Sequence, residues 1–549
     1  MLLRLPEKCL KSILWLTAIL LCLSVQPAAV AQTASSSTLL TAVPPSIEAT
    51  VSSYAELLQA VNETGATDIT IAADYKHGTA GVGESLKPAG SVVIHPAQEG
   101  EITLVGRFDV ASGEISFERI NLQGSAAVTA LWVGGDAVVT VLDVTGGTST
   151  QAMGGCGVEA EGNARVTVRN AIGGDGKTFG GDGIYAGNHA TVYAEYAEGG
   201  NSSSGYAGDG VVCFQAEVEV QGDACGGNGA LSGGHGILLG LDASVSVAGA
   251  AVDGSKTGKG TIPAAPAAYA DLLYALRSGE HDIVLSAKYK HGNSQKWDKP
   301  WFVADSETVV ISSGSKSKNA VLKNRINLNG GIFVLQSISI TGVKNEAAVR
   351  LAGYAVLTIV GNITATGEGA SLLTEDASEV DMTGTLTGMA IVTDESKLNV
   401  TGNLKKGKQN VCLLAQDHAA AAVTGDCNGM IVAAGDSSVS VDGQVKVSAN
   451  VNAVVAHDHS QIDVLGDVQS SASASPALLA DGNGTLSVQG NVTGSKKTNT
   501  ILAKENSAVQ VSGDVTGGTE GTALPTIWQH GKRVTVNGTV SGATYTQAE

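Results

Sequence analysis

Hydrophobic and polar positions alternate along most of this chain in short runs of β-branched residues that end at glycine, asparagine or aspartate. Strict alternation predicts strands with one buried face. In the second half the runs end at marker glycines spaced 18 to 25 residues apart: Gly361, Gly384, Gly402, Gly425, Gly443, Gly466, Gly490, Gly513 and Gly538. In the first half equivalent strands begin at Val139, Val166, Val192, Val218 and Val245, spaced 26 or 27 residues apart.

Repeats of this length with several short strands per unit predict the coils of a parallel β-helix. Each coil would lie about 4.8 Å from the next, with its marker valines pointing inward. Aromatic residues are only 4% of the 549 residues. The predicted core is therefore built from Val, Ile, Leu and Ala, as stacked β-structure favours.

Two segments follow a helical period instead. Tyr54–Val61 and Tyr269–Leu276 each place apolar residues on one face, which predicts a short amphipathic helix. Ser53 and Glu56 have capping-box spacing in the first copy, while Ala268 replaces the serine in the second. A helix at the start of a solenoid covers an otherwise open strand edge.

The helices belong to an internal duplication. Asp68-Ile-Thr-Ile-Ala-Ala-Asp-Tyr-Lys-His-Gly78 returns as Asp282-Ile-Val-Leu-Ser-Ala-Lys-Tyr-Lys-His-Gly292. We therefore expect an all-β fold of two tandem right-handed parallel β-helix solenoids, each with a short N-terminal capping helix. The predicted organisation is a signal peptide at 1–31, a linker at 32–52, a first module at 53–257, a linker at 258–268 and a second module at 269–549.

The N-terminus is typical of a secretory signal peptide: basic residues, the apolar run 13–25, and Ala29-Val30-Ala31 before Gln32. Removing it takes away three positive charges and one negative charge, so the net charge goes from −19 to −21. Such a surface repels nucleic acid. Five cysteines remain, Cys156, Cys213, Cys225, Cys412 and Cys427, and an odd number cannot be fully paired. They are interpreted as small buried residues, or as a Cys412–Cys427 or Cys213–Cys225 bridge.

The opening helices, the Asp-Ile-x-Ile strand and the Val-x-Val-x-Gly coils resemble right-handed parallel β-helix proteins of the pectin-lyase-like superfamily, especially exported bacterial surface proteins. The resemblance covers nearly all of residues 50–545 and implies a fold and an extracellular setting, not an activity. The catalytic motifs of its pectin-degrading members are absent from this sequence.

Glycine-bounded loops in the first module align one coil apart. This alignment predicts a column of Cys156, Asp182, Asp209 and His235, and beside it a column of Met153, Phe179 and Tyr206. Two stacked carboxylates repel unless something lies between them, so Asp182 and Asp209 are candidates to share Ca²⁺. The alternative is that both are solvated turn residues. No other cofactor is indicated.

Aromatic residues give a second candidate site, at Phe179, Tyr185, Tyr206, Trp297 and Trp301. Exposed rings on a rigid β-surface hold sugars by stacking, although packing of loops on one another explains the same cluster. The string Tyr75-Lys76-His77-Gly78, repeated at 289–292, is expected to dock the first helix on its coil.

The expected function is an exported, non-enzymatic, adhesin-like surface protein, secreted or held at the cell surface, that binds a polysaccharide or glycoprotein surface. The alternative is a divergent polysaccharide lyase or hydrolase that uses Asp182 and Asp209 with Arg169 or His235. Few apolar residues follow Val536 and Val540, so the last coil is expected to leave strand edges open to end-to-end self-association.

Overall fold

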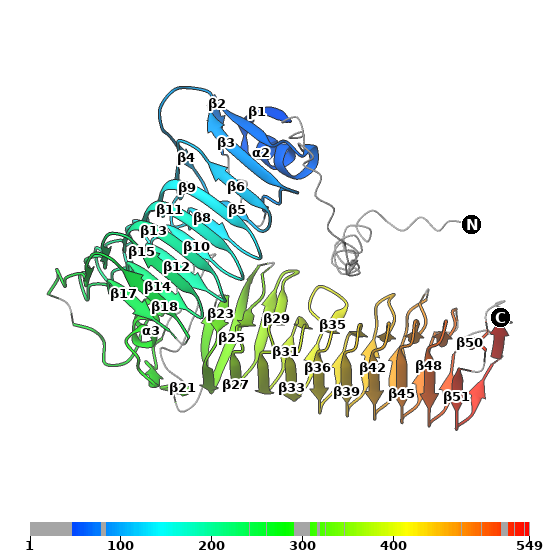
Figure 1. Ribbon diagram of the computed structural model, residues 1–549. Helices are drawn as coiled ribbons and strands as arrows, with labels where there is room; N and C mark the ends of the chain where they lie inside the picture. The colour runs from blue at the N-terminus through cyan, green and yellow to red at the C-terminus, as the bar shows by residue number, and fades with distance from the viewer. Residues whose placement is uncertain are drawn as a thin grey trace, which may run out of the picture. The chain divides into compact units, whose positions relative to one another are not determined.

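Almost every element of the chain is a short β-strand stacked in parallel on the strand one coil away (Figure 1). The structure is a computed structural model that describes residues 47–77, 84–240, 242–259, 261–289, 308–315, 319–323, 325–344, 346–473, 475–495, 497–517, 525–531, 533–542 and 544–547. It is an all-β parallel solenoid of the right-handed type with about 20 turns. The predicted β-helix architecture is confirmed at this level.

The first group of coils builds two sheets. Sheet 1 has 13 strands: β1(Glu48–Ser53), β2(Asp68–Lys76), β3(Ser91–Pro96), β4(Ile102–Val105), β6(Glu114–Phe117), β7(Ile120–Gln123), β9(Val138–Thr145), β11(Arg165–Ile172), β13(Thr191–Glu198), β15(Glu217–Val220), β16(Ala224–Cys225), β18(Ser244–Val247) and β19(Ala251–Val252). Sheet 2 has six: β5(Phe108–Val110), β8(Leu131–Val133), β10(Val158–Ala160), β12(Ile184–Gly187), β14(Val211–Phe214) and β17(Ile237–Leu239).

The second group builds three sheets, with one strand of each in most coils. Sheet 3 contains β20(Asp282–Leu285), β21(Thr308–Ser313), β24(Ile332–Gln336), β27(Val356–Val360), β30(Glu379–Thr383), β33(Lys397–Thr401), β36(Ala420–Val423), β39(Ser438–Val441), β42(Gln461–Val464), β45(Thr485–Val488), β48(Ala508–Val511) and β51(Val534–Val536). Sheet 4 contains β22(Ala320–Lys323), β25(Ile338–Lys344), β28(Ile363–Thr366), β31(Leu386–Thr387), β34(Leu404–Lys405), β37(Cys427–Asn428), β40(Val445–Val447), β43(Val468–Ser470), β46(Val492–Thr493), β49(Val515–Thr516) and β52(Val540–Ser541).

Sheet 5 contains β23(Ile326–Asn329), β26(Val349–Ala352), β29(Ala370–Thr374), β32(Met389–Val392), β35(Val411–Ala415), β38(Met430–Ala433), β41(Val454–Ala456), β44(Leu478–Ala480), β47(Ile501–Ala503), β50(Ile527–His530) and β53(Thr544–Gln547). Within the described part of the chain, none of the five sheets combines strands from both groups.

Helices occur at the two predicted places. Helix α2(Tyr54–Gln59) continues into a π-helical turn, η1(Ala60–Thr64), and α3(Tyr269–Arg277) precedes β20. The Ser53 side chain accepts the N–H of Glu56, as a capping box requires, but the Glu56 carboxylate accepts the N–H of Ser52 rather than that of Ser53. Among the described residues, no helix combines the length and the apolar character needed to cross a bilayer.

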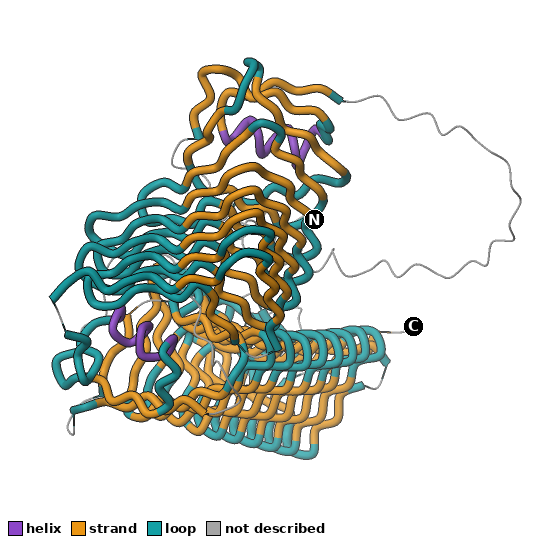
Figure 2. The backbone as a smooth tube through the Cα atoms, turned by 60° about the vertical axis from the view of Figure 1, so that its left-hand side comes forward, coloured by secondary structure: helices purple, strands orange, loops and turns teal. Residues whose placement is uncertain are grey.

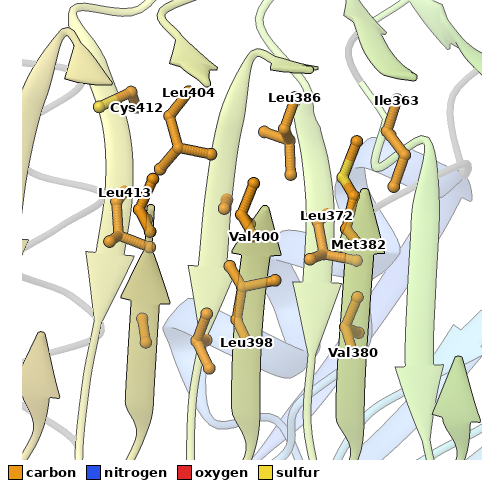
Figure 3. Packing of buried hydrophobic residues seen from close by; sticks show 14 of the residues in the cluster. Ile363, Leu372, Val380, Met382, Leu386, Leu398, Val400, Leu404, Cys412 and Leu413 are labelled. Atoms are coloured by element: carbon orange, nitrogen blue, oxygen red, sulfur yellow. The ribbon is translucent and has the colours of Figure 1, made fainter. Parts of the chain in front are cut away.

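The interior is filled by aliphatic side chains that stack on the same position one coil away. Val139, Val166, Val192 and Val218 are buried as predicted, whereas Val245 is half-buried. In the second group the interior is a continuous row of Leu, Ile, Val, Met and Cys side chains (Figure 3). Since each buried Leu or Val contributes roughly 1.5–3 kcal/mol, stability is spread over all coils.

Asparagine and aspartate side chains tie the turns of successive coils together. Asp514 donates its backbone N–H to the Oδ1 of Asn491 at 2.8 Å, and Asn491 donates to Asp467 at 2.7 Å. Asn228 and Asn201 do the same in the first group at 2.9 Å. These side chains give backbone donors at the turns a partner that the sheet ladders do not provide.

Candidate functional site

Glycine loops of the first group stack directly on one another beside sheets 1 and 2 (Figure 2). A Cβ on Gly181, Gly208 or Gly234 would lie 1.8 Å from a carbonyl oxygen of the preceding coil. Only glycine permits this backbone approach.

Both predicted columns are present. Phe179 bridges Met153 on one side and Tyr206 on the other. Backbone hydrogen bonds join each member of the first column to the member in the next coil. The N–H of Gly157, beside Cys156, donates to the carbonyl of Asp182 at 2.9 Å, and the N–H of Gly183, beside Asp182, donates to the carbonyl of Asp209 at 2.9 Å.

Arg277, the last residue of α3, lies between the two column carboxylates. Its guanidinium donates to Asp182 Oδ1 and Oδ2, both at 2.9 Å, and to Asp209 Oδ2 at 2.6 Å. All three side chains are at most 4% exposed. The result is a buried charge cluster in which one cation faces two anions, a bidentate geometry that arginine forms well.

Other contacts of α3 surround this cluster. The ring of Tyr274 stacks on Tyr206 with centroids 4.3 Å apart, and the Tyr206 hydroxyl donates to Asp271 at 3.0 Å. The Arg277 guanidinium lies 5.5 Å from the centre of the Phe179 ring. Helix α3 is therefore bound to the glycine loops through rings and charges together.

The electrostatics favour the charged cluster. Burial alone would lower the pKa of Arg277, but the carboxylates of Asp182 and Asp209 raise it above its ordinary value. The hydrogen bond from His235 to Asp209, at 3.1 Å, raises the pKa of the His235 imidazole despite its partial burial. Asp209 also accepts the backbone N–H of His235 at 2.8 Å.

The geometry of the Asp182, Asp209 and Arg277 cluster favours a role in stabilising the fold over a role in catalysis. Its carboxylates are buried and their charge is largely met by Arg277, so neither is placed to reach a substrate from solvent. Calcium binding by Asp182 and Asp209 stays a prediction. In the structure, the Arg277 guanidinium lies between the two carboxylates and offsets their mutual repulsion. Within the described ranges, no group of three or more His, Cys, Asp or Glu side chains is arranged to hold a metal ion.

The expectation of an exposed aromatic surface is wrong for three of its five residues. Phe179, Tyr185 and Tyr206 are only 2%, 1% and 1% exposed. Phe179 and Tyr206 are covered by α3, and Tyr185 packs with Val212, Phe214 and Leu238. Trp297 and Trp301 lie outside the described residues.

Arg169 belongs to a separate surface cluster. It donates to both carboxylate oxygens of Asp143, at 2.8 and 2.7 Å, and to Glu101 at 3.2 Å. The predicted catalytic set of Asp182, Asp209, Arg169 and His235 is thus divided, since the hydrogen bonds of Arg169 join it to other carboxylates.

A second buried contact joins the outer face of sheet 2 to the first strands of sheet 5. Asn329 of β23 donates to the hydroxyl of Tyr185 at 2.9 Å, and Arg350 of β26 donates to Glu161 at 3.4 Å. A Cβ on Gly330 would lie 2.2 Å from the Phe214 ring. Nearby, burial raises the pKa of Glu159 to about 7, against the lowering effect of Arg107.

The five cysteines are free thiols in the structure, four of them buried and Cys225 half-buried. Cys213, Cys412 and Cys427 lie in the apolar core clusters. Their interpretation as small interior residues fits this placement.

One functional group, the Arg277 guanidinium, was missed from the sequence. Arg277 and Asn62 occupy matching positions of the duplicated helices, and this difference between the copies was the one available signal. His77 was expected to dock α2, and its ring does lie 4.2 Å from that of Tyr54. Its burial, which lowers the pKa of His77 to about 4, was not foreseen.

Comparisons of the chain with protein-family models, with curated proteins and with solved structures found no match.

Proposed function

We propose that this chain is an exported, non-enzymatic surface protein of the pectin-lyase-like β-helix type that binds a glycan or glycoprotein surface. The signal-peptide pattern of residues 1–31 supports export. The parallel solenoid supports the resemblance, because it is the architecture that the resemblance implied.

The proposal includes two tandem solenoids, at 53–257 and 269–549, each begun by a capping helix. Two observations support this division. The strands before and after residues 258–268 belong to different sheets, and each helix sends apolar side chains into a different core cluster. The cluster of the second helix also takes in Met153, Phe179 and Tyr206 from the loops that this helix covers. Tyr54 and Leu57 enter one cluster, while Leu272 and Leu273 enter the other.

One observation carries the binding proposal: from β30 to β48 the outward face of sheet 3 presents polar side chains in register. This polar row comprises Asp381, Asn399, Ala422, Ser440, Asp463, Ser487 and Gln510. Only Ala422 lacks a hydrogen-bonding side chain. Successive members lie about 4.8 Å apart on a rigid core, which suits an extended partner that offers hydroxyl groups at regular intervals.

Turnover is not proposed. A glycoside hydrolase needs two carboxylates that reach the scissile bond, whereas Asp182 and Asp209 are 1% and 3% exposed and paired with Arg277.

The test is a panel of plant, mucin and microbial glycans, scored for binding and for newly formed chain ends. We expect binding without new ends, and we expect a variant with Asn399→Ala and Ser440→Ala to bind at least tenfold more weakly. Gln469→Ala, on sheet 4, is the matched control and should bind normally. New chain ends, or a loss of binding shared equally by the control, would contradict the proposal.

Export is tested separately: N-terminal sequencing of the exported chain should begin at Gln32.

A further inference from the structure

One outward face of the second group of coils is apolar. On sheet 5 the register places eight apolar residues in a single line, here called the apolar row: Leu373, Ile391, Leu414, Val432, Val455, Leu479, Leu502 and Trp528. At the strand spacing of a sheet, the row is about 35 Å long. Six of its members are half-buried, and Val432 and Val455 are buried further.

These side chains point away from the interior. Leu413 and Ala415, on either side of Leu414, are both fully buried in the core cluster, and successive side chains of a strand point to opposite faces. Figure 3 shows the inward neighbours Leu372 and Leu413 inside the solenoid. The outward polar row of sheet 3 has the opposite chemistry. A continuous line of outward apolar side chains is typical of a surface that meets a partner.

The same sheet face already makes a sheet-on-sheet contact at one end. The strands next to the row, β23 and β26, are covered by sheet 2 through Asn329–Tyr185, Arg350–Glu161 and the contact of Gly330 with Phe214. The covered part has an apolar centre of Tyr185, Val212, Phe214 and Leu238 with polar groups around it. The apolar row continues this interface from β29 onward, since Arg350 of β26 lies in register with Leu373.

We propose that the apolar row is the contact surface for a second copy of this chain, packed face to face and running in the opposite direction. The relative direction of the two copies follows from the end of sheet 5 that sheet 2 already covers, at β23 and β26. If the two solenoids ran in the same direction, the sheet 2 of one copy would meet the sheet 2 of the other. If they run in opposite directions, the covered end of each copy lies beside the uncovered end of its partner. A two-fold axis then crosses the row near Val432 and Val455.

Other occupants fit less well. A sugar needs hydrogen-bonding groups and flat rings, and Trp528 is the one aromatic member of the row. A lipid surface would meet an edge of carboxylates, because Asp394, Glu395 and Asp436 lie exposed in the turns that follow sheet 5. Anionic membranes repel such an edge.

The charged edges give the dimer an unusual salt dependence. In the proposed arrangement, the acidic edge of one copy faces the acidic edge of the other. His418 and His459 lie 3.6 and 3.9 Å from Asp436 on this edge. Salt screens the repulsion and does not weaken the apolar contact. The dimer should therefore tighten severalfold as NaCl rises from low to physiological concentration, while an interface held by ion pairs would loosen.

The first experiment is sedimentation equilibrium on the full-length chain over a hundredfold concentration range. We expect a monomer–dimer equilibrium that a variant with Leu414→Lys and Leu479→Lys shifts at least tenfold toward monomer. Gln469→Lys, on the outward face of sheet 4, is the matched control and should dimerise normally. Circular dichroism checks that each variant keeps its β-structure. A monomeric wild-type chain, or a dimer unchanged by the two lysines, overturns the proposal.

The second experiment tests direction. Facing sheets lie about 10 Å apart, so a bis-maleimide of that reach is the probe. A mixture of the Leu414→Cys and Leu479→Cys variants should form cross-linked dimers, while each variant alone and the unsubstituted chain should not. Cross-linking of each variant with itself overturns the opposite-direction arrangement. A monomeric chain whose binding to phospholipid vesicles or to a polysaccharide is lost in the lysine variant assigns the row to that partner and overturns the second copy.

Discussion

The glycine-loop coils of the first group and the three-sheet coils of the second reach the same parallel stacking by different means. In the first, loops approach so closely that only glycine fits, and one buried cation from α3 joins the column carboxylates. In the second, cohesion is divided among many equivalent aliphatic side chains and turn hydrogen bonds. We infer that single substitutions damage the first region severely and the second only locally.

The largest expected effect comes from removing the cation. Arg277→Met leaves the Asp182 and Asp209 carboxylates buried without the cation that lies between them, which should lower the free energy of unfolding of this region by about 3–5 kcal/mol. Denaturant unfolding measures the change. Arg169→Met removes an arginine that pairs with carboxylates at the surface, and it should cost no more than about 1 kcal/mol. Equal losses in the two variants would contradict the contrast between a buried arginine and a half-buried one at the surface.

A loss of unfolding free energy of nearly the same size is expected near α2 when the pH is lowered. Burial lowers the pKa of His77 to about 4, so between pH 6.5 and 4 the unfolded chain binds the proton more readily than the folded one. The contribution of neutral His77 is complete above pH 6.5 and is lost as pH falls to 4, by about 3 kcal/mol. Hydrogen exchange of 50–77 should follow this curve, and His77→Phe should flatten it.

The contribution of Glu159 to the free energy of unfolding should depend on pH in the opposite direction to that of His77. The pKa of Glu159 rises to about 7 on burial, so its contribution is complete below pH 4.5 and is lost as pH rises to 7. Glu159→Gln should therefore stabilise the chain by about 2–3 kcal/mol at pH 8 and leave it unchanged at pH 4. Thermal melting at the two pH values measures this. The control is exposed Glu217→Gln, and a gain there of the same size would count against a burial effect.

The smallest effect is expected in the second region. Asn491→Ala removes the acceptor of the Asp514 N–H in one turn of a ladder that neighbouring turns repeat. The loss should be about 1 kcal/mol and confined to adjacent coils in hydrogen exchange. Gln510→Ala, in the polar row, serves as control. Cooperative unfolding of the whole region by Asn491→Ala would show that its stability is not divided among the coils.

The sequence was sufficient for features with a period. The inward valines and the column of Asp182 and Asp209 follow from the spacing of repeats, because one coil places equivalent residues on top of one another. The sequence was insufficient to predict contacts between segments that are far apart in the chain. Nothing in the loop pattern indicates that α3 covers Phe179 and Tyr206, so rings expected at the surface are buried.

The apolar row was hidden for a different reason. In β35 the consecutive Leu413 and Leu414 are both apolar, so alternation between the buried and the outward face is invisible without the register. Arg277 was missed because its partners lie 95 and 68 residues away in the chain.

We infer that Arg277 takes the place that a bound cation would have between Asp182 and Asp209. A double-mutant cycle of Arg277→Met and Asp182→Asn, measured by denaturant unfolding in a calcium chelator and again in millimolar calcium, tests it directly. We expect a coupling free energy of about 2–3 kcal/mol that is the same in both solutions. A coupling below about 0.5 kcal/mol, or a wild-type chain that is stabilised by calcium, would contradict it.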